Sequence, residues 1–269
     1  MPKAKAGEVE LSYERSGSGE PLLLIMGMSG TYLHWDEVML GELRERFEVI
    51  VYDHRGVGES ARVSQPFTIS ELAQDAIGLL EALGVGEAHV LGFSMGGMVA
   101  QELVLSRPEL VRTLTLASTY CGGPGSRPAG SETVGKLTSA MASGDREAAL
   151  RAAWEVNVSE RMAQDDAAYA RFAGIAERRR VAVAVVMEQM RAIVAHDTSG
   201  RLPAVRKPTL VIHGTADAMV PVSNGEMIAG LIEGSRLELL EGAAHMFFWE
   251  EPERAATLIA EHALGARAR

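Results

Sequence analysis

Cysteine is almost absent from this chain of 269 residues, which contains Cys121 alone. A single thiol excludes an intramolecular disulfide and argues against a zinc site with cysteine ligands. The seven histidines form no cluster with metal-ligand spacing. We therefore expect chemistry that uses neither a metal ion nor a cofactor.

Long apolar runs are missing as well. No segment approaches the roughly 18 consecutive apolar residues that a membrane-spanning helix requires. Residues 1–7 are polar, and no apolar run of the kind found in signal peptides follows them. These absences predict a cytoplasmic protein with no membrane partner.

Positive charge is scarce, because 26 lysines and arginines stand against 36 acidic residues and give a formal net charge of −10. Nucleic-acid phosphates need a basic surface, so we expect no nucleic-acid partner. The basic run Arg178–Arg180 is short and is typical of a solvated helix face rather than of a phosphate site. Composition does not decide the oligomeric state, and a homodimer remains an open alternative.

Strand-like and helical segments alternate over most of the chain, whose content of 47% hydrophobic and 23% charged residues is ordinary for a globular protein. Apolar runs typical of buried strands lie at 22–26, 49–52, 88–93, 114–117 and 210–213, with a further strand at 237–240 and an alternating edge strand at 8–15. Helical patterns lie at 70–83, 95–107, 224–232 and 250–264. The alternation predicts an α/β fold with a mostly parallel central sheet and helices on both faces.

One segment interrupts this alternation. Residues 121–130 are rich in glycine and proline, which indicates a loop or hinge. Helical spacing then continues to about residue 197, with helices expected at 132–142, 146–156, 165–178 and 181–196. We therefore divide the chain into a core, residues 1–121 and 204–269, and an inserted helical cap, residues 122–203. The cap should lie over the carboxyl edge of the sheet, where ligands bind in open α/β folds.

The segment Gly92-Phe93-Ser94-Met95-Gly96 matches the pattern G-x-S-x-G and stands between an expected strand and an expected helix. A sharp, strained turn there requires tiny residues two places before and after the serine, and Gly92 and Gly96 meet that need. The turn would lift the Ser94 hydroxyl above the sheet. The backbone N–H of Met95, at the helix N-terminus, would then face an oxygen that gains negative charge during a reaction.

With this motif the sequence resembles the α/β-hydrolase family, in which the nucleophile is followed by an acid and then by a histidine. His-Gly-Thr-Ala-Asp, ending at Asp217, and Gly-Ala-Ala-His, ending at His245, stand where the family carries its acid and its base. The resemblance implies that His245 takes the proton of Ser94 and that Asp217 orients the imidazole. Asp197 is the rival acid, although it lies in the insert rather than after a core strand.

The family's second oxyanion donor comes from the loop after the first buried strand, which is Ile25–Gly30 here. The family usually has His-Gly in that loop, whereas this chain has Met26-Gly27. The implied donor is the backbone N–H of Met28, which depends little on the side chain. What supports the loop in place of the family's histidine is left open by the sequence.

Other polar residues receive structural interpretations. His213 ends an expected strand and should brace the acidic loop that follows it, while His89 and His262 should have packing or surface roles. The sequence does not decide whether His34 lines the pocket or supports the structure. The D-x-R-G-x-G-x-S stretch at 53–60 is a structural turn in the resembling family.

A serine nucleophile indicates acyl chemistry, because the dehalogenases and epoxide hydrolases of this fold need a carboxylate at that position. The stretches 52–58, 92–98 and 117–119 resemble the branch of 3-oxoadipate enol-lactonases, which also includes esterases and acyl-homoserine lactonases. We therefore predict a serine hydrolase that cleaves a small carboxylic ester or lactone, with an apolar acyl part, through an acyl-enzyme. The soft apolar side chains expected to line its pocket are Trp35, Phe93, Trp154, Met187, Met190, Met219 and Met246.

Two alternatives remain open. A cofactor-free perhydrolase or haloperoxidase would have the same triad and would use peroxide in place of water. A ligand-binding protein on a hydrolase scaffold would keep the pocket without efficient turnover, although a pure binder has no need of a complete triad.

Overall fold

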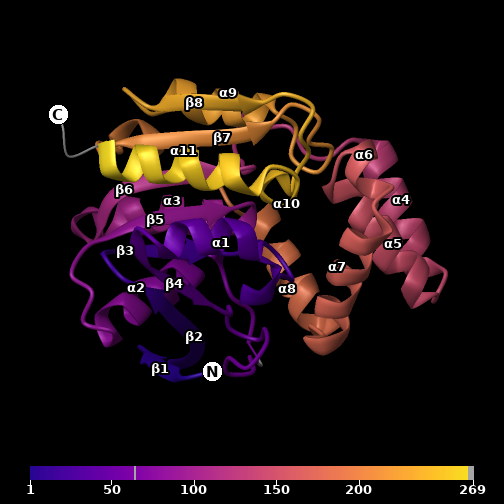
Figure 1. Cartoon of the computed structure of the whole chain (residues 1–269), viewed down its shortest axis with the longest axis horizontal. Helices are drawn as coiled ribbons and strands as arrows, with labels where there is room; N and C mark the ends of the chain where they lie inside the picture. The colour runs from indigo at the N-terminus through magenta and orange to yellow at the C-terminus, as the bar shows by residue number, and fades with distance from the viewer. Residues whose placement is uncertain (64, 266–269) are drawn as a thin grey trace.

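The computed structural model describes residues 1–63 and 65–265. In this range eight strands form one sheet, in the spatial order β1-β2-β4-β3-β5-β6-β7-β8 (Figure 1). The strands are β1 (Lys3–Ala6), β2 (Val9–Gly17), β3 (Glu20–Ile25), β4 (Phe47–Tyr52), β5 (Ala88–Phe93), β6 (Val111–Ala117), β7 (Thr209–Gly214) and β8 (Arg236–Leu240). Neighbouring strands from β4 to β8 in this order are parallel to each other. The pairs β1–β2 and β2–β4 are antiparallel. The predicted α/β fold class with a mostly parallel sheet is confirmed.

Helices cover both faces of the sheet. Helices α2 (Ile69–Ala82) and α3 (Met95–Ser106) contribute to the hydrophobic cluster on one face, and α1 (Glu37–Arg44) and α11 (Pro252–Gly265) contribute to the cluster on the other. Further helical elements are η1 (Tyr32–His34), η2 (Pro108–Leu110), η3 (Leu202–Ala204), α9 (Ser223–Leu231) and α10 (Phe247–Glu250).

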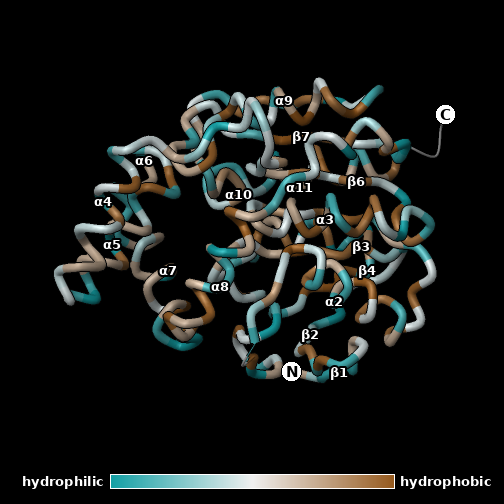
Figure 2. The backbone as a smooth tube through the Cα atoms, turned by 180° about the vertical axis from the view of Figure 1, so that it is seen from behind, coloured by the Kyte–Doolittle hydropathy of each residue, from teal (hydrophilic) through white to brown (hydrophobic). Residues whose placement is uncertain are grey.

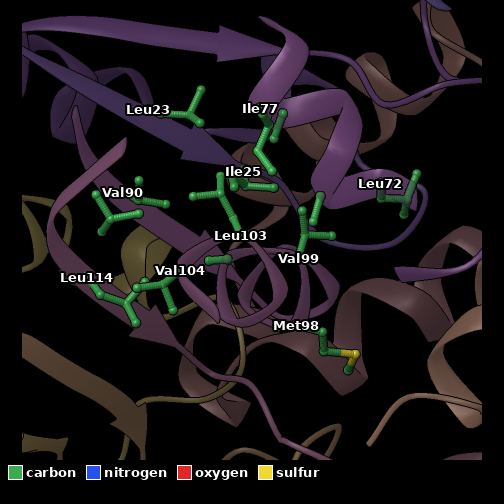
Figure 3. Packing of buried hydrophobic residues seen from close by; sticks show 14 of the residues in the cluster. Leu23, Ile25, Leu72, Ile77, Val90, Met98, Val99, Leu103, Val104 and Leu114 are labelled. Atoms are coloured by element: carbon green, nitrogen blue, oxygen red, sulfur yellow. The ribbon is translucent and has the colours of Figure 1, made fainter. Parts of the chain in front are cut away.

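Strand β3 illustrates why the sheet is buried on both faces. Successive side chains of a strand point to opposite sides, so Leu23 and Ile25 join the cluster with α2 and α3, whereas Leu22 and Leu24 join the other cluster. Figure 3 shows Leu23 and Ile25 beside Ile77 of α2. Each such buried side chain stabilises the fold by about 1.5–3 kcal/mol relative to leaving it in water.

Two elements of the core differ from the sequence-based prediction. The segment expected as the edge strand, β2, has β1 on its outer side, with Lys3 paired to Ser12 and Ala6 to Val9. Four residues of alternating lysine and alanine are too short and too poor in β-branched side chains to predict this strand. Helix α1 was also not predicted, although its Asp36 N-cap accepts hydrogen bonds from two N–H groups of the first turn.

Five α-helices lie between β6 and β7, namely α4 (Ser131–Ala142), α5 (Arg146–Asn157), α6 (Glu160–Ala163), α7 (Asp166–Arg178) and α8 (Val183–Val194). Four of them match the expected helices within a few residues, and the short α6 is additional. Figures 1 and 2 show α4 to α7 beside one end of the sheet, with α8 between them and the core. The division into a core and a cap at residues 122–203 stays a prediction.

No helix among residues 1–63 and 65–265 is long and apolar enough to cross a membrane. The cytoplasmic location and the homodimer stay predictions.

Candidate active site

The turn between β5 and α3 holds Ser94 in a strained backbone conformation. Its φ is 55° and its ψ is −120°, a combination that residues with a side chain rarely adopt. A Cβ atom added at Gly92 would collide with the Gly96 carbonyl, and one added at Gly96 would collide with the Ile25 carbonyl. The turn therefore needs both glycines, and it leaves Ser94 partly exposed while its neighbours are buried.

Ser94, His245 and Asp217 form one hydrogen-bonded series. The Oγ of Ser94 lies 3.0 Å from Nε2 of His245, and Nδ1 of His245 lies 2.7 Å from Oδ2 of Asp217. His245 and Asp217 are 3% and 6% exposed, so water competes little for these bonds. With a proton on Nδ1 facing the carboxylate, Nε2 is left to accept the proton of the serine hydroxyl.

The Asp217 carboxylate is held in its ionised form. Burial by itself would raise its pKa, but the facing His245 and His213 outweigh burial and lower the pKa well below its usual range. Its Oδ1 also accepts hydrogen bonds from the N–H groups of Met219 and Val220, at 2.9 and 2.8 Å. His213 bonds to the Val220 carbonyl at 2.7 Å and so braces this loop, as the sequence predicted.

Two free backbone donors lie beside Ser94. A Cβ atom added at Gly27 would stand 3.1 Å from Cβ of Ser94, so the loop after β3 runs directly along the nucleophile. Within the residues that the structure describes, no hydrogen bond takes up the N–H of Met28 or Met95. These are the donors that the sequence assigns to an oxyanion hole.

The structure answers how the loop after β3 is supported without the family's histidine. Nε2 of His54, on the loop after β4, bonds to the Met26 carbonyl at 2.9 Å. On the other side of Met28, the N–H of Ser29 donates to Oε1 of Gln189 on α8, also at 2.9 Å. Sequence reasoning missed both contacts, because the partners are distant in the chain and no local pattern pairs either side chain with the loop after β3.

Two further contacts steady the neighbouring turns. The Thr119 hydroxyl donates to the Ser94 carbonyl at 2.7 Å and thus supports the strained turn from β6. Asp53 accepts the Tyr32 N–H at 2.9 Å, and the Ser60 hydroxyl donates to the Asp53 carbonyl at 2.6 Å. The stretch 53–60 therefore has the structural role that was expected of it.

Comparison with known proteins identifies the family. The sequence model of the alpha/beta hydrolase fold matches residues 20–252. The chain belongs to this family. A putative carbamate hydrolase, RutD, of Azorhizobium caulinodans is 32% identical to it over 262 residues, which cover 94% of each chain.

Solved structures agree with this assignment. The esterase RhEst1 from Rhodococcus sp. ECU1013 has a TM-score of 0.83 at 26% identity, over 97% of this chain and 98% of the esterase. An enol-lactonase from Burkholderia xenovorans LB400 has the same fold, with a TM-score of 0.82 at 24% identity over 97% of this chain and 99% of the other. The expected kinship with α/β-hydrolases of the esterase and lactonase branch is confirmed, and the protein is an enzyme of that family.

The aromatic residues predicted to line the pocket of this hydrolase are mostly buried. The Phe93 ring lies 4.8 Å from the His245 ring, between centroids, and so supports the imidazole. Trp35 is 2% exposed and packs against Phe93 and Phe248 beneath it. Trp154 is fully buried against Trp249, at 5.6 Å. Both tryptophans are buried in this structure, and their contact with a substrate stays a prediction.

The predicted methionines of the pocket differ in exposure. Met246 is buried and directly follows His245, whereas Met219 is half-buried and donates its N–H to Asp217. Met187 and Met190 on α8 are 58% and 41% exposed. Their role in a substrate pocket stays a prediction.

The alternative histidines and acid of this hydrolase lie apart from the triad. His34 bonds through Nδ1 to the Thr31 N–H at 3.0 Å, and burial lowers its pKa to about 4, so it supports the structure. His196 lies 3.8 Å from Glu102, and burial likewise lowers its pKa to about 4. Asp197 is exposed and accepts the Ser199 N–H, so the structure brings no catalytic partner to it.

The hydrolase also has a cavity of about 1030 Å³ between α5, α6 and the loops after β7 and β8. Ala216 and Ala218 line it on either side of the acid, but Ser94 and His245 do not. Its walls include Glu155, Arg161 and other polar residues, so it does not suit an apolar acyl group. Among the residues described here, no group of three or more histidine, cysteine or acidic side chains is arranged to hold a metal ion.

Proposed function

We propose that this enzyme is a serine hydrolase that cleaves carboxylic esters or lactones through an acyl-enzyme. The observation that carries the proposal is the unbroken hydrogen-bonded series from Ser94 through His245 to Asp217, with the serine on a strained turn. A hydroxyl is a poor nucleophile until a base removes its proton, and His245 lies within reach to do so.

The reaction follows from these contacts. Ser94 Oγ attacks the carbonyl carbon while its proton passes to Nε2 of His245, and Asp217 stabilises the imidazolium. The N–H groups of Met28 and Met95 take up the negative charge on the carbonyl oxygen. The proton then passes to the leaving alkoxide, which departs as an alcohol, or stays attached as a hydroxyl if the substrate is a lactone. Water, activated by His245, repeats the sequence and releases the acid.

The insert would act as the cap of this site. Asn157, at the end of α5, accepts the N–H of Met246 at 2.7 Å, and Ser159 donates its N–H to Glu250 at 3.0 Å. These bonds attach the insert to the loop that carries His245. Helix α8 contacts the opposite loop through Gln189. The proposal assigns contact with an apolar acyl chain to Met187 and Met190, which are exposed on the same helix.

The substrate class is tested by a turnover panel. It contains p-nitrophenyl esters of graded chain length, γ-lactones, acyl-homoserine lactones, an amide and, because one relative is named as a putative carbamate hydrolase, a carbamate. We expect turnover of esters or lactones with a burst of the first product, the sign of an acyl-enzyme. If the carbamate is turned over faster than the esters and lactones, the substrate class is carbamates, and the proposed mechanism through Ser94 is kept. Halide oxidation with peroxide and acetate that outpaces ester cleavage would favour the perhydrolase alternative.

The nucleophile is tested by chemical labelling. A serine-directed phosphonate should abolish turnover and modify Ser94, whereas EDTA should leave turnover unchanged. Activity that EDTA removes and a metal ion restores would overturn the proposal. Stable retention of the product after one slow turnover would indicate a binding protein instead.

A further inference from the structure

Helix α8 contacts the loop after β3 through a single buried amide. Gln189 has no exposed surface, and its Oε1 accepts the N–H of Ser29 at 2.9 Å. Val185 and Ala192 are buried on the same side of the helix, so this side faces the core. The two residues joined by the amide are 160 positions apart in the chain, and the bond links the insert to the segment beside the nucleophile.

The position of this bond within the loop matters. His54 holds the peptide group between Met26 and Gly27 through the Met26 carbonyl. Gln189 holds the peptide group between Met28 and Ser29 through the Ser29 N–H. The peptide group between these two joins Gly27 to Met28, and it carries the free N–H of Met28. Because the flanking peptide planes are both anchored, the direction of this N–H is restricted.

The backbone at Ser29 needs such an anchor. Its φ of 57° lies in the left-handed region, which a residue with a side chain adopts at a cost and keeps only where its surroundings hold it. Meanwhile Nε2 of Gln189 is buried and has no hydrogen-bond partner in the described part of the chain. A buried amide with an unpaired donor is a poor stabiliser of the fold, so its distinctive contribution is the acceptor that it offers to the loop.

We propose that Gln189 is a positioning residue, which aims the Met28 N–H at the oxyanion and thereby couples the insert to catalysis. This inference rests on the proposed serine hydrolase function. It predicts that loss of the amide oxygen impairs the chemical step rather than substrate binding, because the Met28 N–H interacts most strongly with the negative charge that develops in the transition state.

The test compares two variants with a matched control in the full-length enzyme. Gln189→Met removes the acceptor at similar volume. Gln189→Glu keeps an acceptor for Ser29 but adds a charge that opposes the oxyanion when ionised. Arg191→Met is the control, because Arg191 also bonds from α8 to the backbone of the core, donating to the Phe67 carbonyl at 2.7 Å rather than to the loop after β3.

We expect Gln189→Met to lower kcat on a p-nitrophenyl ester by about 10- to 100-fold, less than the loss of an oxyanion donor itself, with KM within about threefold. The rate of inactivation by a phosphonate should fall in parallel, since that reaction also builds charge on an oxygen. Gln189→Glu should have a bell-shaped pH profile whose activity falls as the pH rises and the new carboxyl ionises. Arg191→Met should match the wild type.

Wild-type kcat and inactivation rate in a folded Gln189→Met enzyme would overturn the inference. An equal loss in Arg191→Met would also overturn it, because the effect would then be a general loosening of α8. If Gln189→Met does not fold, the pH profile of Gln189→Glu decides, and a profile with the wild-type shape counts against the inference. Full activity of Ser94→Ala would instead refute the proposed function, independently of the Gln189 result.

Discussion

Asp217 and His245 are joined by a hydrogen bond of 2.7 Å between Oδ2 and Nδ1, although the two residues lie 28 positions apart on loops after different strands. The other carboxylate oxygen is taken up by two backbone N–H groups of its own loop. The carboxylate can therefore rotate little, and it fixes both the orientation and the tautomer of the imidazole.

This relationship predicts the effect of Asp217→Asn. The two backbone N–H groups require an oxygen at the Oδ1 position, so the amide of Asn would turn its NH2 toward Nδ1 of His245. This contact favours the wrong tautomer, and kcat should fall by up to about 10⁴-fold. Asp197→Asn is the control and should retain full activity, because Asp197 is exposed and remote from the imidazole. Steady-state kinetics of both variants shows which of the two carboxylates acts as the acid of the triad. The opposite result would transfer the role of the acid to Asp197.

Ser94→Ala and His245→Ala should each lower kcat by about 10⁴- to 10⁶-fold, since members of a triad act as a unit. The double variant should be little worse than either single one. Circular dichroism and thermal unfolding check that the fold persists. Additive losses in the double variant would show that the two residues act independently.

The pH dependence of stability follows from buried histidines. Burial lowers the pKa from its ordinary value of 6.5 to about 4 in His34, His54, His196 and His262. In the unfolded chain these groups bind protons near pH 6.5, so the free energy of unfolding should be unaffected by them above that pH and should fall between pH 6.5 and 4. Each histidine contributes a slope of up to about 1.4 kcal/mol per pH unit.

Urea unfolding at a series of pH values measures this slope. Asp53 and Asp75, whose pKa values are raised by burial, act in the opposite sense and partly offset it. The variant His262→Gln isolates the contribution of one histidine. It should reduce the slope of the free energy of unfolding against pH by up to about 1.4 kcal/mol per pH unit, which corresponds to one proton. A free energy of unfolding that is constant from pH 6.5 to 4, with no change in the variant, would contradict the expectation.

Within the insert, different residues should control substrate choice and stability. Met187→Ala and Met190→Ala should shift the chain-length optimum and change KM for long acyl esters about tenfold, because each buried CH₂ contributes about 0.8 kcal/mol. Their rates with a small acetate ester should stay within a few-fold. Trp154→Ala should instead destabilise the protein by about 3–5 kcal/mol, since this side chain is fully buried.

Kinetics over the ester series and urea unfolding check the two effects. An unchanged chain-length profile in both methionine variants would place the acyl pocket in the loops of the core. A stable Trp154→Ala enzyme with altered specificity would show that the tryptophan becomes accessible when substrate binds.

The fold class and the identity of the residues that meet at Ser94 could be predicted from local patterns in the chain. Buried strands and helices have local signatures, and the strained turn requires glycines at fixed spacing around the serine. Once parallel strands are assigned, their carboxyl ends share one edge of the sheet, so Asp217 and His245 had to approach the same place. The element β1 escaped prediction because a strand of four residues has too little pattern.

How the site is supported, and which side chains are exposed, depends on how distant segments of the chain pack together. His54 and Gln189 hold the loop after β3 from the core and from α8, and neither contact is encoded in local periodicity. Trp154 and Met187 were both predicted to line the pocket because they are apolar. Trp154 is fully buried, whereas Met187 is 58% exposed. Hydrophobicity predicts that a side chain will seek an apolar surface, whereas the packing of whole helices decides whether the protein supplies that surface or leaves it for a substrate.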